Sequence, residues 1–373
     1  MQNPMNNLQN PLENAAENKY NKTKLFLPVY TGIQIFFGRG SSIMKKFWMA
    51  AAAVVLCAAM LLTGCGGGNA IKIGTGGNTG TYFAYSTAVA QILQNKTGLT
   101  VSALSTGGSV ANINGINDKD YNMGIVQNDT MINAYNGLDA KNFKNGAVTS
   151  FSVMGEVYSE VVQIVVDAKL KDKVKTLADL KGLRVSVGDA GSGVYSNAKD
   201  LLAAYGLDID KDIQQNNLSV GSSADAMKDG KLDAFFFTAG APTTAITELQ
   251  TSMDVFLLSL EEDVMQKFID EHKIDGKYEV YSVQPITHAQ YACIPEDAPV
   301  KTIGVTATFI VANSLSEDDV YNMTKALWES TDEIAKAHAV GSSMDINNAF
   351  ATIGNVPLHP GAEKYYKEQG LLK

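Results

Sequence analysis

The sequence predicts an α/β fold of two hinged lobes with a ligand cleft between them, and three observations support this prediction. Short apolar strands alternate with glycine-rich loops and helices, a pattern typical of parallel sheets with crossover helices. Two longer β-rich stretches, residues 151–166 and 278–286, interrupt the alternation, and we expect them to form the hinge. The 309 residues from Cys65 to Lys373 suffice for two lobes of about 150 residues each.

Three strands and two helices are expected before the first β-rich stretch. The helix after the first loop has one apolar face, because apolar residues recur at i, i+4, i+7 and i+8, and Gly98 ends it. The residues of that face are Tyr85, Val89, Ile92 and Leu93. The remaining expected elements are strands at 71–74, 100–104 and 123–126 and a short helix at 110–116.

The alternation restarts after residue 166, where a glycine closes each expected helix. The expected elements there are helices at 177–181, 195–205 and 223–229 and strands at 184–188 and 234–237. A strand near 303–311 and helices between residues 317 and 338 follow. We expect lobe 1 to comprise residues 71–160 and 282–373, and lobe 2 to comprise residues 161–281.

The start of the chain predicts export. Two lysines after Met44 precede an apolar run from Phe47 to Leu62, which at 16 residues is shorter than the roughly 20 of a membrane span. We therefore interpret residues 44–64 as a lipoprotein signal peptide. Residues 1–43 lack any sustained apolar period and are interpreted as a non-native or disordered leader.

The end of this segment, Leu62-Thr63-Gly64-Cys65, resembles the lipobox of bacterial lipoproteins. That resemblance implies that Cys65 is lipidated and anchors the protein to the outer face of the cell membrane or to its periplasmic face. Residues 65–70 then form a flexible glycine-rich tether.

Charge argues against nucleic acid as a partner. The chain holds 30 basic and 39 acidic residues, and six of the basic and two of the acidic ones precede Cys65, so the remainder has a net charge of −13. Such a surface repels polyanions. Arg184 is the one arginine after Cys65.

Four strand-to-helix loops share the same chemistry. They are rich in Gly, Ser and Thr and contain no Lys or Arg: 75–81, 105–109, 189–193 and 238–242. Ligands of parallel α/β sheets bind beyond the carboxyl ends of the strands, where helix N-termini expose unpaired N–H groups and a positive dipole end. The loops therefore predict a clamp for a small anionic metabolite, held without a cationic side chain. One such loop alone would be an ordinary helix cap.

No cofactor and no catalytic motif is expected. The first loop fits neither G-x-G-x-x-G nor the P-loop pattern, and the chain has no H-E-x-x-H and no G-x-S-x-G. The acidic runs at 261–263 and 317–319 are interpreted as solvent-exposed helix starts. Cys293 has no surrounding motif and is interpreted as core packing.

These loops, taken in order, resemble the TAXI-type solute-binding subunits of tripartite ATP-independent periplasmic (TRAP) transporters. The landmarks are Ile73-Gly74-Thr75-Gly76-Gly77 with Gly80-Thr81-Tyr82, Ser105-Thr106-Gly107-Gly108-Ser109-Val110 with Asn112, Gly191-Ser192-Gly193, Asp233-Ala234-Phe235-Phe236 with Ala239-Gly240-Ala241-Pro242, and Leu358-His359-Pro360-Gly361-Ala362. The resemblance covers the chain from Ile71 to about Leu371. Members often carry Thr after Gly-Ser-Gly, where this chain has Val194.

The resemblance implies a two-lobed, type II periplasmic-binding-protein-like fold that closes on its ligand. It also implies TRAP membrane subunits as partner and a glutamate-like amino acid or a dicarboxylate as ligand. The other large class of TRAP binding subunits holds its carboxylate with an arginine; here Arg184 opens a strand, away from the loop end. We expect His359 to fix the C-terminal turn.

Ligand contacts are expected from both lobes. The candidates in lobe 1 are Thr79, Gly80, Thr81, Tyr82, Ser105, Thr106, Gly108, Ser109, Asn112, Gln127, Asn128, Asp129 and Glu160. The candidates in lobe 2 are Asp189, Gly191, Ser192, Thr238 and Gly240. Tyr82 either packs on the ligand or is a core tyrosine. An amino-acid ligand would need Asp129, Glu160 or Asp189 for its ammonium group, whereas a dicarboxylate would require these acids to face away.

Three alternatives stay open. The chain could serve an ABC importer for a small anion, act as an anchored hydrolase through Ser192 or Ser109, or only sense its ligand. Neighbouring genes distinguish the two transporter types, and turnover of candidate esters would reveal a hydrolase.

Overall fold

The computed structural model describes residues 70–274 and 276–373. The expected leader, signal peptide and lipidated Cys65 lie outside this part of the chain. Within the described part, a single mixed sheet runs in the order β2-β1-β3-β10-β4-β7-β5-β6, with β8 beside β4 and β9 beside β10. The strands are β1 (Ile71–Gly74), β2 (Val101–Leu104), β3 (Met123–Gln127), β4 (Phe151–Asp167), β5 (Arg184–Ser186), β6 (Gln214–Asn216), β7 (Ala234–Ala239), β8 (Val255–Leu257), β9 (Ser282–Ile286) and β10 (Val300–Ala312).

Helices connect these strands at nearly every step. They are α2 (Thr81–Thr97), α3 (Ser109–Asn117), α4 (Asn128–Asn136), α5 (Gly193–Ala204), α6 (Val220–Lys228), α7 (Thr244–Ser252), α8 (Glu262–Glu271), α9 (Glu317–Trp328), α10 (Thr331–Ala337) and α11 (Pro360–Glu368). Short 3-10 turns lie at Ala168–Leu170, Leu177–Leu180, Ala339–Ser343 and Ile346–Asn348. Both acidic runs lie at helix starts, in the first turns of α8 and α9, as expected.

The sheet has two similar halves, which we call the first half (β1, β2, β3) and the second half (β5, β6, β7). In each half three strands are parallel, with the earliest strand in the middle, and a long antiparallel strand follows. That long strand is β10 beside β3 and β4 beside β7. The arrangement is the type II periplasmic-binding-protein-like fold expected from the sequence.

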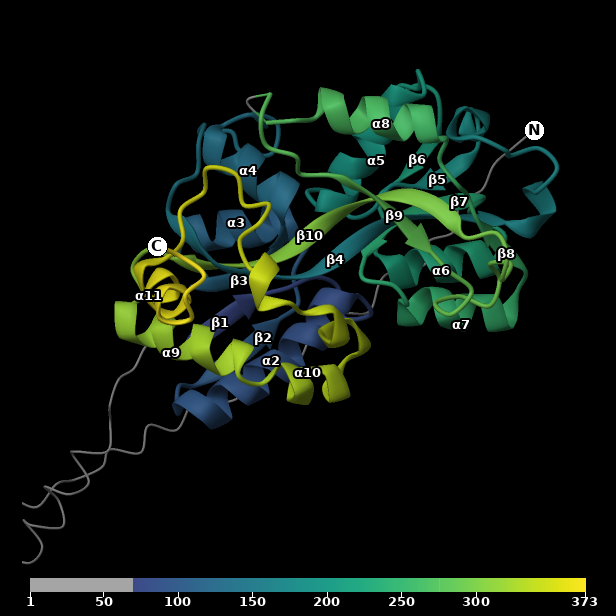
Figure 1. Cartoon of the computed structure of the whole chain (residues 1–373). Helices are drawn as coiled ribbons and strands as arrows, with labels where there is room; N and C mark the ends of the chain where they lie inside the picture. Colours follow the sequence, from purple (N-terminus) through teal and green to yellow (C-terminus); the bar gives the residue numbers. More distant parts are fainter. Residues whose placement is uncertain (1–69, 275) are drawn as a thin grey trace, which may run out of the picture. The chain divides into compact units, whose positions relative to one another are not determined.

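Strands β4 and β10 carry the chain between the halves (Figure 1). β4 pairs with β10 from Phe151 to Val161 and with β7 from Val161 to Val166. The expectation that residues 278–286 form part of the hinge, and so carry the chain back to the first half, is wrong. Only Ser282–Ile286 of this stretch is a strand, and it pairs with the first residues of β10, so the return crossing is made by β10. The stretch is too short to span both halves, whereas β10 has 13 residues.

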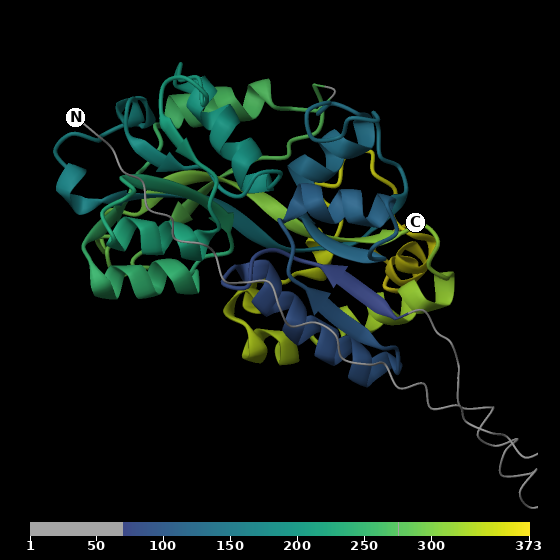
Figure 2. The ribbon, with the colours of Figure 1, turned by 180° about the vertical axis from the view of Figure 1, so that it is seen from behind.

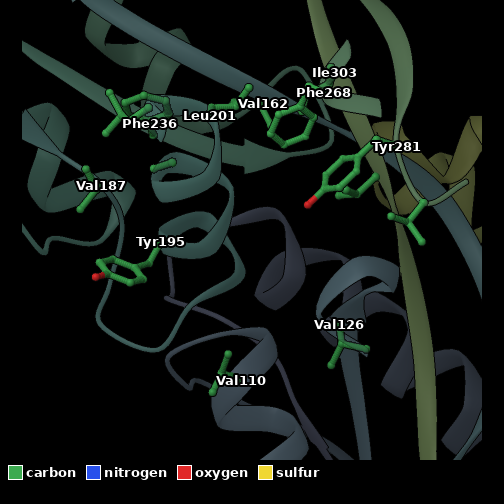
Figure 3. Close-up of a cluster of buried hydrophobic side chains, with 14 of the residues drawn as sticks. Val110, Val126, Val162, Val187, Tyr195, Leu201, Phe236, Phe268, Tyr281 and Ile303 are labelled. Carbon is green, nitrogen blue, oxygen red and sulfur yellow. The ribbon is translucent and has the colours of Figure 1, made fainter. Parts of the chain in front are cut away.

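Helices cover both faces of the sheet (Figures 1 and 2). One face is continuous over both halves and packs against α3, α4, α5 and α8. Figure 3 shows part of this core, with Val110 and Val126 from the first half and Leu201 and Phe236 from the second. On the other face α2, α9 and α10 cover the first half, and α6 and α7 cover the second.

The central strands are apolar on both sides, as strands with two covered faces require. Ile125 and Val126 are adjacent in β3 and belong to cores on opposite faces. Cys293 is partly buried and packs against the core that lines α6 and α7, as expected.

Candidate functional site

The four glycine-rich loops meet around one cavity, which we call the central cavity. Its walls include Gly76 and Gly77 of the first loop, Gly107 to Ser109 of the second, Asp189 to Gly193 in part, and Thr238 at the end of β7. Both halves of the sheet therefore contribute to the same space. Its volume is about 60 Å³, and since one water molecule needs roughly 10–15 Å³, it has room for about four to six water molecules.

Two helices begin at this cavity without a side-chain cap. The residues before α2 and α3 are Gly80 and Gly108, and neither supplies an oxygen to the first N–H groups. Gly108 has a φ of 101°, a backbone conformation that side chains disfavour. By contrast, Ser192 caps α5 by accepting a hydrogen bond from the Tyr195 amide. The N-terminal ends of α2 and α3 thus leave N–H donors open to an anion.

Tyr82 and Glu160 form a buried polar pair in the cavity wall. The Tyr82 hydroxyl donates to Glu160 Oε2 over 2.7 Å, which links the first turn of α2 to β4. Glu160 is only 1 % exposed, and burial raises its pKa to about 8 while the bond from Tyr82 opposes this rise. Tyr82 was expected either to pack on the ligand or to be a core tyrosine. Its ring is half-buried and lies in the cavity wall, a position from which it can contact a ligand.

Other polar groups in the wall come from both halves. Ser109 Oγ accepts a hydrogen bond from the backbone N–H of Gln127. Gln127 is 2 % exposed, and its Oε1 has no partner among the described residues. Asp189 is partly exposed, and burial raises the pKa of its carboxyl.

Sequence reasoning missed the apolar part of the wall. Phe237, Leu218 and Val220 line the cavity in the second half. Phe237 ends the predicted strand 234–237, so its place at a strand end was visible in the sequence. A fifth loop, which contains no glycine, precedes α6. The sequence feature that could have located it is Ser219, which caps that helix.

The structure brings ten of the expected contact residues to the central cavity. They are Gly80, Thr81, Tyr82, Gly108, Ser109, Gln127, Glu160, Asp189, Ser192 and Thr238. The other eight lie outside its wall: Thr79, Ser105, Thr106, Asn112, Asn128, Asp129, Gly191 and Gly240.

Several of these eight support the loops instead. Asn112 is fully buried, and its amide donates to the carbonyls of Thr75 and Ile125, both at 2.7 Å. Thr106 donates to Asn112 Oδ1 over 2.7 Å. Thr79 lies in the wall of a neighbouring cavity that also includes Asp225 and His338. The polar groups of Asn112 and Thr106 are therefore engaged within the loops and the neighbouring strand.

Asp129 and Asn197 join the two halves behind the cavity. Asn197 of α5 donates to Asp129 Oδ2 of α4 over 2.8 Å, and Tyr281 donates to the same oxygen over 2.6 Å. Thr238, in the cavity wall, donates to Asn197 Oδ1 over 2.9 Å. All of these side chains are buried, so Asp129 already has its partners and is not a free counter-ion for a ligand.

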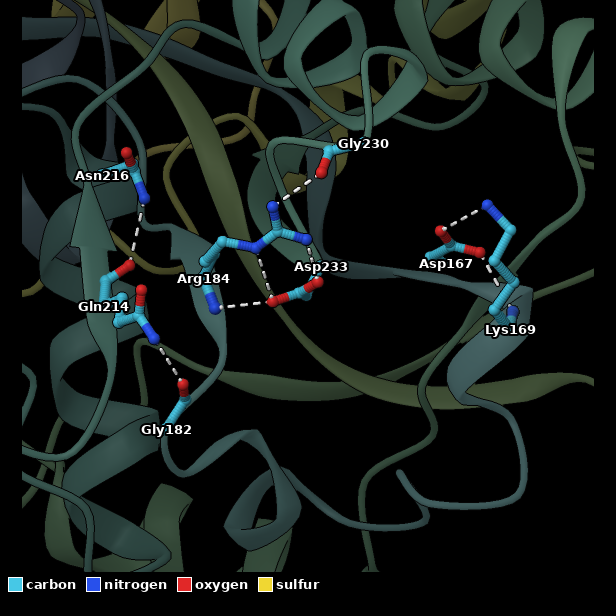
Figure 4. A network of polar contacts seen from close by, with 8 residues as sticks. All are labelled: Asp167, Lys169, Gly182, Arg184, Gln214, Asn216, Gly230 and Asp233. Atoms are coloured by element: carbon cyan, nitrogen blue, oxygen red, sulfur yellow. Dashed lines mark hydrogen bonds and ion pairs between the residues drawn. The ribbon is translucent and has the colours of Figure 1, made fainter.

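Arg184 lies at the start of β5, at the opposite end of that strand from the loop, as expected. Its guanidinium donates to both carboxylate oxygens of Asp233 and to the Gly230 carbonyl (Figure 4). Those bonds hold the pKa of the Asp233 carboxyl below its usual value. Arg184 is therefore committed to a structural pair.

His359 caps α11 by accepting from the Gly361 amide, in agreement with the expected role in the C-terminal turn. Neither Ser109 nor Ser192 is hydrogen-bonded to a histidine in the part of the chain that the structure describes; their oxygens accept from backbone amides. His338 lines the neighbouring cavity, and burial lowers its pKa.

A family model described as the NMT1-like family matches residues 73–370, which is most of the chain and includes every loop of the central cavity. The chain belongs to the NMT1-like family. The TAXI-type group expected from the motifs is a finer assignment and stays a prediction.

Solved structures share this fold. A structure titled as that of a periplasmic transporter is 13 % identical, with 81 % of this chain and 93 % of that chain covered and a TM-score of 0.50. PhnD1 of Prochlorococcus marinus, in complex with methylphosphonate, is 11 % identical, with 81 % and 99 % covered and a TM-score of 0.48. A binding protein component of an ABC phosphonate transporter from Pseudomonas aeruginosa is 13 % identical, with 81 % and 95 % covered and a TM-score of 0.47. At these identities the likeness concerns the fold alone.

Across residues 70–274 and 276–373, every helix is too short or too polar to cross a membrane.

Proposed function

We propose that this NMT1-like chain is an extracytoplasmic solute-binding protein that holds a small carboxylate in the central cavity and delivers it to a membrane transporter. The observation that carries the proposal is the convergence of four strand-end loops, two from each half of the sheet, on one small space. A ligand there contacts both halves and stabilises their approach to each other.

The cavity offers donors for a carboxylate. The uncapped starts of α2 and α3 present N–H groups and a positive dipole end, and Ser109 adds a hydroxyl. A hydrogen bond to a charged group contributes about 1.5–3 kcal/mol. Several such bonds reach the roughly 8 kcal/mol that micromolar binding needs.

The two halves already touch at several points, as a clamp on a small ligand requires. Lys141 Nζ, in the first half, lies 2.8 Å from the Tyr195 hydroxyl of α5. Thr81 Oγ1 donates to the Gly240 carbonyl over 3.4 Å. We propose that lobe 1 comprises residues 71–160 and 282–373 and that lobe 2 comprises residues 161–281. Within lobe 1, β9 and the first part of β10 pack beside the second half of the sheet.

For the membrane partner we propose the permease of an ABC importer, with TRAP membrane subunits as the alternative. The matching family is described as NMT1-like and not as TAXI-type, which leaves the TRAP assignment resting on the motif resemblance alone. A gene for a transport ATPase beside this one would support the ABC partner, and genes for ion-driven membrane subunits would support TRAP. Lipidation of Cys65, detected by mass spectrometry of the N-terminal peptide, would place the protein on the membrane surface.

A thermal-shift screen of the purified full chain tests the binding function. The compounds are amino acids, dicarboxylates and inorganic anions, and a ligand at a hundredfold excess over its Kd should add about 2.7 kcal/mol of stability. Gly77→Leu fills the cavity and should abolish the shift. Asn78→Leu, one residue further and outside the cavity wall, is the matched control and should keep it. No shift with any compound would refute the proposal, and turnover of esters would indicate the hydrolase instead.

A further inference from the structure

Glu160 has an unusual position for a carboxyl group. It lies on β4 in the wall of the central cavity and is 1 % exposed. The one hydrogen bond of its carboxyl group among the described residues is the bond that Tyr82 donates to Oε2. An ionised carboxyl group buried in this way costs several kcal/mol unless a cation pairs with it. Without such a cation the group keeps its proton.

No cation of the protein meets Glu160 in the described structure. The central cavity wall contains no Lys, Arg or His, and its second acid is Asp189. The other titratable groups that act on Glu160 are Asp129, Tyr82 and Tyr158, and the negative charge of Asp129 adds to the effect of burial. The protein's own groups therefore favour the protonated carboxyl, consistent with a pKa of about 8.

The cavity wall holds a second buried side chain, Gln127, with an oxygen that can accept a hydrogen bond from a ligand. Gln127, in the same wall, is 2 % exposed, and its Oε1 lacks a hydrogen-bond partner in the described part of the chain. Buried acceptors without a donor are rare because each one costs about 1–3 kcal/mol. The cavity thus joins a donor side, formed by the starts of α2 and α3, to an acceptor side at Glu160 and Gln127.

We propose that Glu160 is a specificity-determining residue that pairs with a cationic nitrogen of the ligand. The site then selects small carboxylates that also carry an ammonium group over dicarboxylates that lack one. This inference rests on the proposed function and specifies the charge of its ligand. When such a ligand binds at neutral pH, the Glu160 proton leaves to the solvent and the ammonium takes its place as the partner of the carboxylate.

The sign of the pH dependence differs between the two ligand classes. A ligand with an ammonium group requires ionised Glu160, so its affinity should rise from pH 6 to pH 8. A dicarboxylate requires protonated Glu160, so its affinity should fall over the same range. The difference arises because binding of the first ligand releases a proton and binding of the second retains it.

Calorimetry with L-glutamate and glutarate tests the proposal, because the two compounds differ only in the amino group. Titrations of the full chain at pH 7 in two buffers of different ionisation enthalpy give the number of protons released. We expect L-glutamate to bind at least about 100-fold more tightly, which corresponds to roughly 2.7 kcal/mol, and to release most of one proton. If the side chain of glutamate is too long for the cavity, L-alanine and propionate serve as the same comparison.

Variants of two glutamates on β4 separate specificity from folding. Glu160→Gln should lose most of the preference and the proton release, and glutarate should bind it more tightly than the wild type. Glu156→Gln changes an equally buried glutamate outside the cavity wall and should keep both properties. Circular dichroism confirms that each variant folds, and the wild-type proton release tests the proposal without any variant.

The outcomes distinguish this inference from the proposed function. Equal binding of both compounds without proton release overturns the role of Glu160 and leaves the solute-binding function intact. A preference for L-glutamate that survives Glu160→Gln also overturns it, because another group then selects the nitrogen. If none of the screened compounds binds, the proposed function itself is wrong.

Discussion

The Tyr82 hydroxyl lies 2.7 Å from Glu160 Oε2, so the first turn of α2 is tied to β4 inside the cavity wall. Tyr82→Phe removes this donor and leaves the ring. We expect a loss of about 1–3 kcal/mol in the free energy of unfolding, since a buried acceptor loses its partner. The loss of the bond should also raise the pKa of Glu160 further and weaken binding of an ammonium-bearing ligand at pH 7. Chemical denaturation and calorimetry measure the two effects.

Tyr321→Phe is the matched control for this variant. Tyr321 donates to Glu368 over 2.6 Å on the exposed surface, outside the cavity wall. Its loss should leave ligand binding unchanged. An equal loss of affinity in both variants would contradict a specific role for the Tyr82 bond.

Glu156 should make the protein less stable as the pH rises toward neutrality. It is 3 % exposed on β4, accepts hydrogen bonds from Thr352, and burial raises its pKa to about 7. The folded state therefore holds a proton that the unfolded chain releases near pH 4.5. This contribution is fully present below about pH 4.5, declines between pH 4.5 and 7, and is absent above that range, with a total on the order of 3 kcal/mol.

Urea denaturation at several pH values between 4 and 8 measures this dependence. Glu156→Gln should show a flatter profile than the wild type over that window. Glu333→Gln, at an exposed position on α10, should follow the wild-type profile. A Glu156→Gln profile parallel to that of the wild type would show that Glu156 does not titrate there.

Arg184 should be dispensable for ligand binding. Its guanidinium is bound to Asp233 and Gly230 at the end of β5 remote from the loop. We expect Arg184→Lys to lower the unfolding temperature slightly, because lysine cannot reproduce the forked pair. The Kd for the ligand should stay within about twofold, as for distant independent sites. A large loss of affinity would mean that the site uses an arginine after all.

Gly193 should control how closely the two halves approach. It is the first residue of α5, and a methyl group there would lie 2.0 Å from Gln127 Oε1 and 2.6 Å from Gln127 Cδ. Gly193→Ala is expected to weaken ligand binding at least about tenfold, or roughly 1.4 kcal/mol. The fold itself should be retained, since alanine favours a helix more than glycine does.

A double-mutant cycle with Gln127→Ala identifies the cause. In the Gln127→Ala background the methyl group has space, so adding Gly193→Ala should cost much less affinity than in the wild type. The same loss in both backgrounds would show that the methyl group acts on something other than Gln127.

The local sequence determined where most elements and loops lie. Alternating apolar runs and glycines placed β1, β2, β3 and the helix that carries Tyr85, because strand and helix periods are properties of the chain itself. The same local rules located the four loops and the acidic helix starts. They failed for the return crossing, since the pairing of β10 with both β3 and β4 depends on contacts between residues distant in the chain.

Only the tertiary structure decided which polar residues face the cavity. Asn112 and Asp129 stand beside strand ends as Gln127 and Ser109 do, yet their polar groups are used by Thr75, Ile125, Asn197 and Tyr281. The physical reason is that a buried polar atom takes the nearest available partner, and that partner comes from another segment of the chain. The sequence by itself determined that the four loops carry no arginine, and the folded chain decided that Glu160 and Asp189 are the acids in the cavity wall.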